Sequence, residues 1–371
     1  MHRGVREFIR WVEAHRDDAE IQLNPPATTS DIAALEQMLG GPIPADLRFV
    51  LTRFNGGVLP AGELLPAGIE PGTIGHTVRE YAEAVGGDFL DTELLLPFHK
   101  TPEGSLLAFD RSAGPVSDTW PVVDYYQDLD EHRLMYRTFD GWCRVCVAEW
   151  TSDDFGADFT LETYLRSGQR HAEVEPDVAT AHATVAHALK RSGRPADSLA
   201  AYLQAARCVP PLPWCDWEAL KIAAILDDEA SAREAATRLA SYAPAAHWAQ
   251  RETSPGRVAE VLGPIVRRSG DPKPLLRLLE QLKAQADEEE GPVVEAILEA
   301  LHAGKDLPPV RPLREQSVVP HVPDVDAWWE ASQAAYAEGR LRDDDLLLDP
   351  DMVRLGRLRP FAELLHIRRG F

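Results

Sequence analysis

Hydrophobic side chains recur at helical spacing near the start of the chain. They share one face of three predicted helices, the first from Val5 to about His15 and the other two within residues 32–54. The apolar positions are Val5, Phe8, Ile9 and Val12 in the first helix, Ile32, Leu35, Met38 and Leu39 in the second, and Leu47, Val50, Leu51 and Phe54 in the third. Each of these amphipathic helices needs a partner against which to bury its apolar face.

Shorter apolar or alternating runs follow, separated by turn-forming residues, and they predict the strands of an antiparallel sheet. The runs are residues 64–66, 94–99, 105–110, 122–126 and 133–136, with a hairpin turn at 128–131. A further helix is predicted after Thr138, which suits an N-cap. Its apolar face holds Phe139, Trp142, Cys143, Cys146 and Trp150. This order of elements predicts an α+β domain over residues 1–168, in which the sheet packs with helices.

The composition changes near Gly168 to a region rich in alanine and leucine, and residues 169–304 are predicted to be all helical. Small and large side chains between Ala179 and Pro210 are spaced as in a tetratricopeptide repeat, and a weaker copy ends 34 residues later at Pro244. A third helix pair is predicted around residues 258–282. We therefore predict about three stacked helical hairpins, because none of them alone can bury its apolar face.

Residues 305–371 are predicted to form a third part of the chain. It begins with a proline-spaced linker, which cannot hold a continuous helix, and ends in short helices. The adjacent Trp328 and Trp329 either dock back on the helices or meet a partner. Docking back is favoured, because burial within the chain avoids the entropy cost of association.

The net charge of the chain, −22, is unevenly distributed. Residues 1–170 contain 28 acidic and 14 basic side chains, and residues 80–162 alone contain 18 acidic and 5 basic ones. The predicted sheet half is therefore strongly acidic. Such a surface repels nucleic acid and anionic membranes, and it accelerates encounters with basic proteins. An acidic surface that serves only solubility is the alternative interpretation.

Other features of the composition indicate a cytoplasmic protein. No apolar run approaches the roughly 20 residues that a membrane span requires, and the start of the chain lacks the apolar core of a signal peptide. Four cysteines in 371 residues do not form a disulfide framework.

A search for chemistry finds no catalytic or phosphate-binding motif, so we predict no enzyme activity, no cofactor and no metal site. Cys143 and Cys146 form a C-x-x-C pair, but a zinc site needs two further ligands and a redox pair is typical of a helix N-terminus. We interpret them as core residues. The acids at 128–131, followed by His132, are better explained by a tight turn than by a metal. The adjacent Asp153 and Asp154 give no sign of converging on a cleft.

The two-helix segment also carries a motif that resembles the SUKH (Smi/Knr) superfamily. The motif combines a Leu-Glu pair, a glycine, an Ile-Pro pair, and Phe and Leu before Asn-Gly-Gly. The residues that carry it are Leu35, Glu36, Gly40, Ile43, Pro44, Phe49, Leu51, Asn55, Gly56 and Gly57. The resemblance covers roughly the first 165 residues and implies the same order of helices, sheet and helix. We expect the motif residues to have a structural role.

The resemblance implies a protein-binding function. Bacterial SUKH domains resemble immunity proteins that neutralise toxins by covering them, so we predict a cytoplasmic inhibitor of a toxin, expected to be basic. The acids expected to meet this partner are Asp124, Asp128, Asp130, Glu131, Asp153 and Asp154. Two alternatives stay open at this point. The chain is an adaptor that binds partners through its helical repeats, as fungal members of the superfamily imply, or it is an enzyme whose site carries no recognised motif. The oligomeric state is not indicated.

Overall fold

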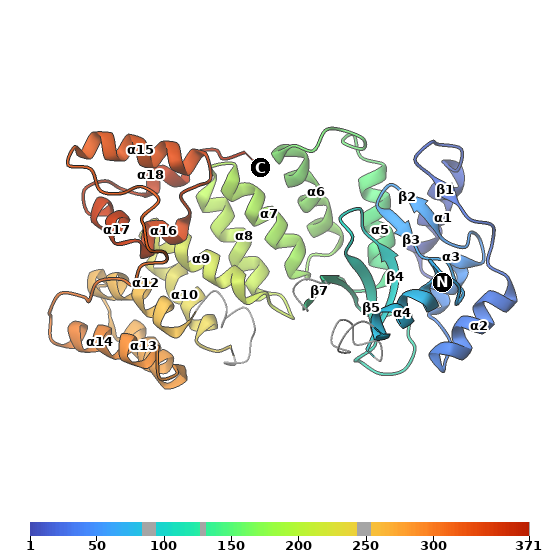
Figure 1. The fold of residues 1–371 in the computed structure, drawn as a ribbon, viewed down its shortest axis with the longest axis horizontal. Helices are drawn as coiled ribbons and strands as arrows, with labels where there is room; N and C mark the ends of the chain where they lie inside the picture. The colour runs from blue at the N-terminus through green and yellow to red at the C-terminus, as the bar shows by residue number, and fades with distance from the viewer. Residues whose placement is uncertain (84–93, 127–130, 243–253, 371) are drawn as a thin grey trace. The chain divides into compact units, whose positions relative to one another are not determined.

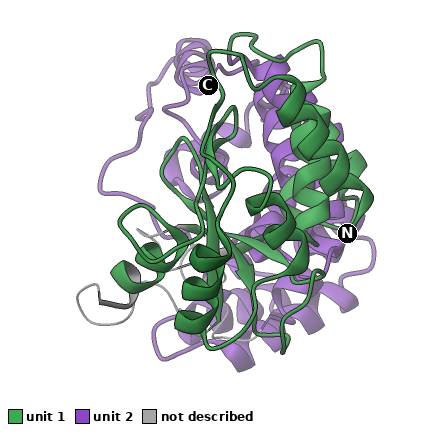
Figure 2. Cartoon of the chain, turned by 90° about the vertical axis from the view of Figure 1, so that its right-hand side faces the viewer, with its two compact units in different colours: residues 1–158, 167–181 green, residues 159–166, 182–371 purple. Residues whose placement is uncertain are grey.

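Residues 1–158 and 167–181 form one unit of the chain, and residues 159–166 and 182–371 form a second one (Figure 2). We call them unit 1 and unit 2. The computed structural model describes the whole chain except residues 84–93, 127–130, 243–253 and 371 (Figure 1). The predicted α+β class is confirmed, because an antiparallel sheet with helices precedes a helix-rich region.

Unit 1 is built on an antiparallel sheet whose seven described strands pair in the order of the chain. The strands are β1 (Gln22–Leu23), β2 (Gly57–Leu59), β3 (Gly62–Leu64), β4 (Leu95–Lys100), β5 (Leu106–Asp110), β6 (Val122–Tyr126) and β7 (Glu131–Tyr136). The five predicted runs correspond to β3 through β7. The two strands that the sequence did not predict, β1 and β2, are too short to show an alternating pattern.

Helices supply the core that covers one face of this sheet. They are α1 (Arg3–Ala14), α2 (Thr29–Leu39), α3 (Ala45–Leu51), α4 (Ile74–Glu83) and α5 (Phe139–Trp150). Alternation along β5 divides its side chains between the two faces. Leu107 and Phe109 join the helical core around Phe8 and Trp142, whereas Leu106 and Ala108 join a second buried cluster. The helix α4 was not predicted.

The helices α1 and α5 pack side by side and run in the same direction. At their N-terminal ends, Gly4 of α1 lies so close to α5 that a Cβ on this glycine would be 2.8 Å from the Asp140 carbonyl oxygen. At their C-terminal ends, the rings of Trp11 and Trp150 lie 4.6 Å apart between centroids. Because both helices point the same way, the segments that follow them leave on the same side of unit 1.

Unit 2 is built of short helices, several of which are joined by tight turns. Its helical hairpins occur where the sequence predicted them, although their relation to tetratricopeptide repeats stays a prediction. The helices are α7 (Ala179–Arg191), α8 (Pro195–Arg207), α9 (Pro213–Ile225), α10 (Glu229–Leu239), α12 (Pro255–Arg268), α13 (Lys273–Gln285) and α14 (Gly291–His302). The turns use left-handed backbone at Gly193 and Asp227, with φ of 72° and 57°. An aspartate therefore occupies the turn position where a repeat usually has glycine.

The predicted boundary near residue 168 lies within α6 (Leu161–Val174), and the chain passes between the two units within α6 and α7. The domain division at residues 168 and 304 therefore stays a prediction, and we use the two units instead.

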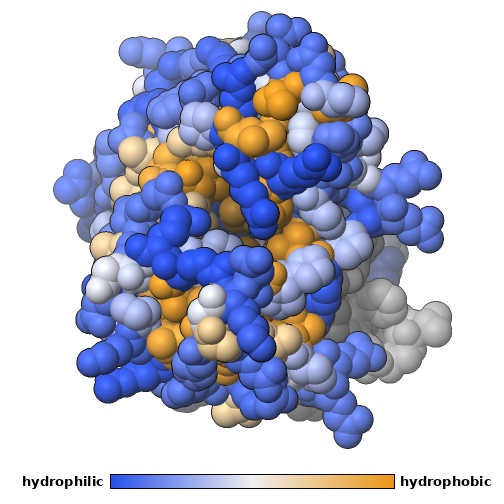
Figure 3. All heavy atoms as spheres, turned by 90° about the vertical axis from the view of Figure 1, so that its left-hand side faces the viewer, coloured by the Kyte–Doolittle hydropathy of each residue, from blue (hydrophilic) through white to orange (hydrophobic). Residues whose placement is uncertain are grey.

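The last part of the chain packs into unit 2. Its helices are α15 (Val325–Ala337), α16 (Asp343–Leu348), α17 (Pro350–Gly356) and α18 (Ala362–Leu365), and α16 packs against α9 and α12. Both adjacent tryptophans are buried, in agreement with the prediction that they pack within the chain. Trp328 Nε1 donates to the Val319 carbonyl oxygen at 3.2 Å, and Trp329 stacks on Phe361. On the face near α14, α15 and α17, hydrophobic side chains gather in patches separated by polar ones (Figure 3).

Candidate protein-binding surface

The first half of the SUKH-like motif joins α2 to α3. Glu36 Oε1 accepts a hydrogen bond from the Ile43 N–H at 2.9 Å, and the same carboxylate pairs with Arg48 in α3. Gly40 ends α2 with a φ of 69°, and Pro44 is the N-cap of α3. One glutamate therefore fixes both the loop and the second helix to the end of the first.

The second half of the motif attaches this helix pair to the sheet. The side-chain oxygen of Asn55 accepts a hydrogen bond from the Ala67 N–H at 2.7 Å. The backbone N–H of Asn55 donates to the Pro25 carbonyl oxygen at 3.1 Å. Gly56 and Gly57 have φ values of 71° and 130°, and a Cβ on either would collide with backbone of the adjoining strands. Such close approaches require glycine.

The remaining motif side chains belong to the core. Leu35 and Leu51 are fully buried, and Phe49 packs against the same cluster. The motif positions described here therefore contact helix ends, strand backbone and the core of unit 1, and these contacts orient the two helices on the sheet. That their role is structural stays a prediction.

The predicted partner-binding acids that the structure describes differ in their exposure. Asp124 lies in β6 and is half-buried, and burial raises the pKa of its carboxyl group. Asp154 shares Arg170 with Glu149, with nitrogen–oxygen distances of 2.8 Å to each carboxylate. Asp153 is exposed. Asp153 is therefore the acid of these three that is best placed to meet another molecule.

The other three predicted acids lie at or before the start of β7. Asp128 and Asp130 fall outside the described residues, and so does the predicted hairpin turn except for its last residue, Glu131, which is the first residue of β7. The side chain of Glu131 is not described. Their role in partner binding stays a prediction.

Asp153 belongs to a larger acidic surface, formed where the parallel helices α1 and α5 end. Residues 13–20 and 149–158 follow the two helices and together contain eight acids and one arginine. The acids are Glu13, Asp17, Asp18, Glu20, Glu149, Asp153, Asp154 and Asp158. We call these two segments the acidic end of unit 1. A turn in which the Asp18 N–H donates to the His15 carbonyl oxygen keeps the first segment close to α1.

The acidic end also contains a group of aromatic side chains. Phe155 is 43% exposed, and its ring meets Trp11 edge to face at 6.0 Å between centroids. Trp11 also stacks on His15 at 4.1 Å and contacts Trp150. A partly exposed aromatic cluster with a charged rim is typical of the energetic centre of a protein interface.

The carboxylates of the acidic end oppose the helix dipoles. The C-terminal end of a helix carries partial negative charge, which favours cations nearby, yet neither α1 nor α5 has a basic residue in its last turn. Glu13 and Glu149, which lie in the last turns, each cost about 0.3–1 kcal/mol. Arg170 compensates Glu149 and Asp154. Asp17, Asp18, Glu20 and Asp153 stay exposed, where a basic partner would neutralise them.

The sequence predicts Asp153 as a partner-binding residue but gives no sign that Asp17, Asp18 and Glu20 belong to the same surface, because they lie more than 130 positions earlier. The link between the two segments is the parallel packing of α1 and α5. Helical periodicity shows that each helix has an apolar face, but it does not show in which direction two such helices run relative to each other.

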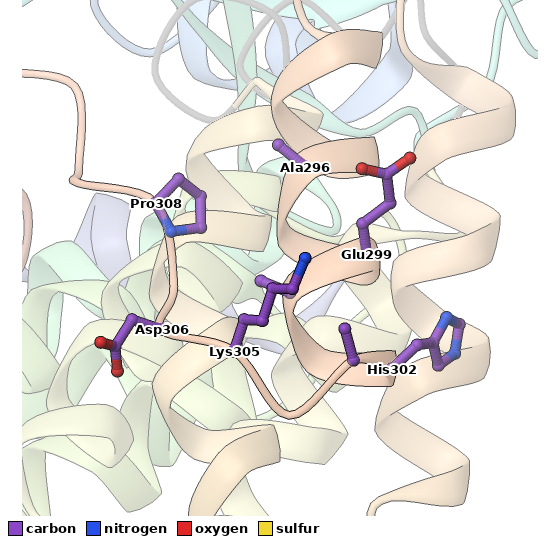
Figure 4. Close-up of a pocket in the computed structure, with 8 residues that line it drawn as sticks. Ala296, Glu299, His302, Lys305, Asp306 and Pro308 are labelled. Atoms are coloured by element: carbon purple, nitrogen blue, oxygen red, sulfur yellow. The ribbon is translucent and has the colours of Figure 1, made fainter.

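The described residues contain no group of three or more His, Cys, Asp or Glu side chains placed to hold a metal. Cys143 and Cys146 are buried in the core of unit 1, and burial raises the pKa of both thiols. A groove of about 650 Å³ runs along α14 (Figure 4). The side chains of Glu299, His302 and Asp306 in this groove point in three different directions, so no acid–base pair forms there.

Unit 1 is thus an α+β domain whose surface, in the parts described, is suited to contact with another protein. Residues 26–144 match the family model described as the SMI1 / KNR4 family (SUKH-1). This match supports a SUKH domain in the N-terminal part of the chain. A comparison with curated proteins found no match. In the part of the chain that the structure describes, no helix has the length and hydropathy to cross a bilayer.

Proposed function

We propose that this protein is a cytoplasmic, immunity-type inhibitor that neutralises a basic toxin by binding it directly. The observation that carries the proposal is the acidic end of unit 1, which combines exposed acids with the partly exposed ring of Phe155. The SUKH match supports a protein-binding role. No catalytic step is part of this proposal, because an inhibitor of this kind works by covering its target.

The acids and the aromatic cluster have different tasks in this mechanism. Long-range attraction between opposite charges raises the association rate by roughly 10- to 1,000-fold, and salt screens it. Burial of Phe155 against the partner contributes mainly to a slow dissociation rate. An inhibitor must meet its toxin before the toxin acts, so a fast association rate is the property that the acids supply.

The first experiment identifies the partner. The gene next to the one for this chain is co-expressed with it, and cell growth is measured with and without this chain. Rescue from a toxic neighbour with a basic domain supports inhibition. A neighbour that is harmless, or toxicity that this chain does not relieve, contradicts the proposal.

The second experiment tests the surface. We expect Asp17→Lys, Asp18→Lys and Asp153→Lys together to slow association about tenfold or more at low salt, with a smaller effect at 0.5 M salt. Phe155→Ala should instead speed dissociation. The matched control is Glu70→Lys, a charge reversal at an exposed acid outside the acidic end. Association that is indifferent to the triple reversal and to ionic strength contradicts the acidic-end mechanism.

The same measurement separates two candidate acidic sets. A triple variant at and before the start of β7, Asp128→Lys, Asp130→Lys and Glu131→Lys, tests the acids that the sequence indicated. If this variant slows association and the acidic-end variant does not, the partner meets residues 128–131 and not the ends of α1 and α5.

An adaptor is the second candidate function. It is favoured by the successive hairpins of unit 2, because stacked helix pairs form extended surfaces for peptides. A toxin inhibitor does not need such a region. Pull-down of a partner that requires residues of α8 to α13, and no rescue from the neighbouring gene, would support the adaptor.

A further inference from the structure

A charged cleft in unit 2 is independent of the surface discussed above. It has a volume of about 640 Å³, which lies in the range of small-molecule sites. Segments far apart in the sequence line it, namely the end of α7, the middle of α9, the linker near residue 314, the start of α16 and the residues after α18. The cleft therefore exists only when the last part of the chain is packed on the helices.

The charge of the cleft is opposite to that of the chain. Six lysine and arginine side chains line it, against three acids, although the chain as a whole carries −22. The cations are Lys190, Arg191, Lys221, Arg314, Arg342 and Arg369, and the acids are Glu218, Asp343 and Asp344. The composition of the chain, with 60 acidic and 38 basic side chains, does not explain an excess of basic side chains in one cleft.

The lysines of the cleft are already compensated. Lys190 Nζ lies 2.7 Å from Glu218 and 3.1 Å from Asp343, and Lys221 Nζ lies 2.7 Å from both Glu218 and Asp344. These cations lower the pKa of the Glu218 carboxyl group to about 2, although its burial acts in the opposite direction. The two lysines and three acids therefore form a structural network.

The arginines are less completely compensated. Arg314 pairs with the buried Asp345 at 3.0 Å. Counting Asp345, the cleft has six cations and four carboxylates, which leaves a charge of +2. The part of this excess that is buried, at Arg369, is costly unless a counter-charge is present.

Arg369 shows this excess most directly. Its side chain is 9% exposed, and its nearest carboxylate among the ion pairs of the described residues is Asp343 at 3.7 Å. Its Nε and Nη2 atoms are buried and donate no hydrogen bond within the described residues. The guanidinium lies 4.2 Å over the ring of Tyr336. The backbone N–H of Arg369 donates to the Arg191 carbonyl oxygen, which holds the end of the chain against the end of α7.

The neighbouring histidine reports the same excess of positive charge. Burial, together with the positive charges of Lys190 and Arg191, lowers the pKa of His187 to about 4. At neutral pH this imidazole is uncharged, so it lines the cleft without adding another cation.

We propose that this cleft binds a small molecule that carries two negative charges on a phosphate or on a pair of carboxylates. Arginine forks match the oxygens of both groups, and a dianion balances the charge of +2. The ligand contacts the last part of the chain and the helices at once, so its binding stabilises the packing of α16 on α9.

Calorimetric titration of the full chain with inorganic phosphate, and separately with the dicarboxylate succinate, tests the proposal. We expect one of them to bind with a Kd below 1 mM, and the comparison of the two identifies phosphate or carboxylate as the preferred group. Arg342→Gln and Arg369→Gln should each weaken binding about tenfold. The matched control is Arg233→Gln, at an exposed arginine of α10 outside the cleft, and it should leave the Kd unchanged.

Arg342 is exposed, so its variant keeps the test valid if Arg369→Gln fails to fold. Hydrogen exchange gives a second readout, because the ligand should slow exchange in α9 and α16. Absence of binding by both anions at 10 mM overturns the proposal. So does binding that is equally strong in the wild-type chain and in Arg342→Gln.

Discussion

Replacing Gly56 with alanine tests whether the SUKH-like motif is required for backbone geometry. Gly56 has a φ of 71°, and a Cβ built on it would lie closer than 3.0 Å to three backbone atoms of residues 64–66. Those atoms belong to the segment from β3 to the following loop, which pairs with β4. The strain therefore cannot be relieved by rotating a side chain.

The expected cost has two parts. An alanine in left-handed backbone costs about 1–2 kcal/mol. Forcing a methyl group into packed backbone costs about another 1–3 kcal/mol. We expect Gly56→Ala to lower the free energy of unfolding of unit 1 by about 2–5 kcal/mol, which is a large share of the stability of a typical domain.

Gly40 provides a matched control, because its φ of 69° is nearly the same and nothing lies within 4 Å of the position of its Cβ. Gly40→Ala should therefore cost only the conformational part, about 1–2 kcal/mol. The difference between the two variants isolates the close approach of the backbone at Gly56.

The assay is hydrogen exchange by mass spectrometry at increasing urea concentration, followed in peptides from α1 and β5. This readout reports the opening of unit 1 by itself, whereas a single unfolding curve of a two-unit chain mixes both transitions. Equal destabilisation by the two alanine variants would refute the argument that the motif glycine is required by its surroundings.

Two further substitutions test the core and a helix cap. His99 is buried, both of its ring nitrogens lack hydrogen-bond partners, and burial lowers its pKa to about 4. As the pH decreases, the imidazole of His99 is protonated in the unfolded chain before it is protonated in the folded one. The free energy of unfolding therefore falls between pH 6.5 and pH 4, by up to about 3 kcal/mol. We expect His99→Phe to reduce the loss of stability in this pH range, measured by urea unfolding at each pH. If stability depends on pH in the same way in the variant, His99 is not the cause. Thr28 forms a capping box with Asp31, so Thr28→Ala should cost about 1 kcal/mol in urea unfolding, whereas Thr29→Ala should be nearly neutral.

The parts of the fold that the sequence predicted share one property, which is that their pattern is long enough to be periodic. The runs that became β4 and β5 are bounded by turn residues, and the apolar face of α5 extends over three turns. The strands β1 and β2 have two and three residues, so they form by pairing with neighbours and leave no pattern of their own.

Sites assembled from distant segments could not be predicted in this way. Asp17 and Asp153 follow the adjacent ends of α1 and α5 because these helices run in parallel, and the six cations of the cleft come from five segments of unit 2. Each of these charges, taken alone, is an ordinary surface residue. Even the net charge was a poor guide, since the same acidic chain contains a cleft with excess positive charge.

The position of the acidic end relative to the family match bears on how such a protein recognises its partner. The match covers residues 26–144, whereas the acidic end consists of residues 13–20 and 149–158, which lie on either side of it. The motif inside the match fixes backbone, through Glu36, Asn55 and Gly56. Constraints of that kind do not apply to exposed acids in the flanking segments. A protein that must recognise one particular partner can therefore change the charges around Phe155 without disturbing the geometry that the motif secures.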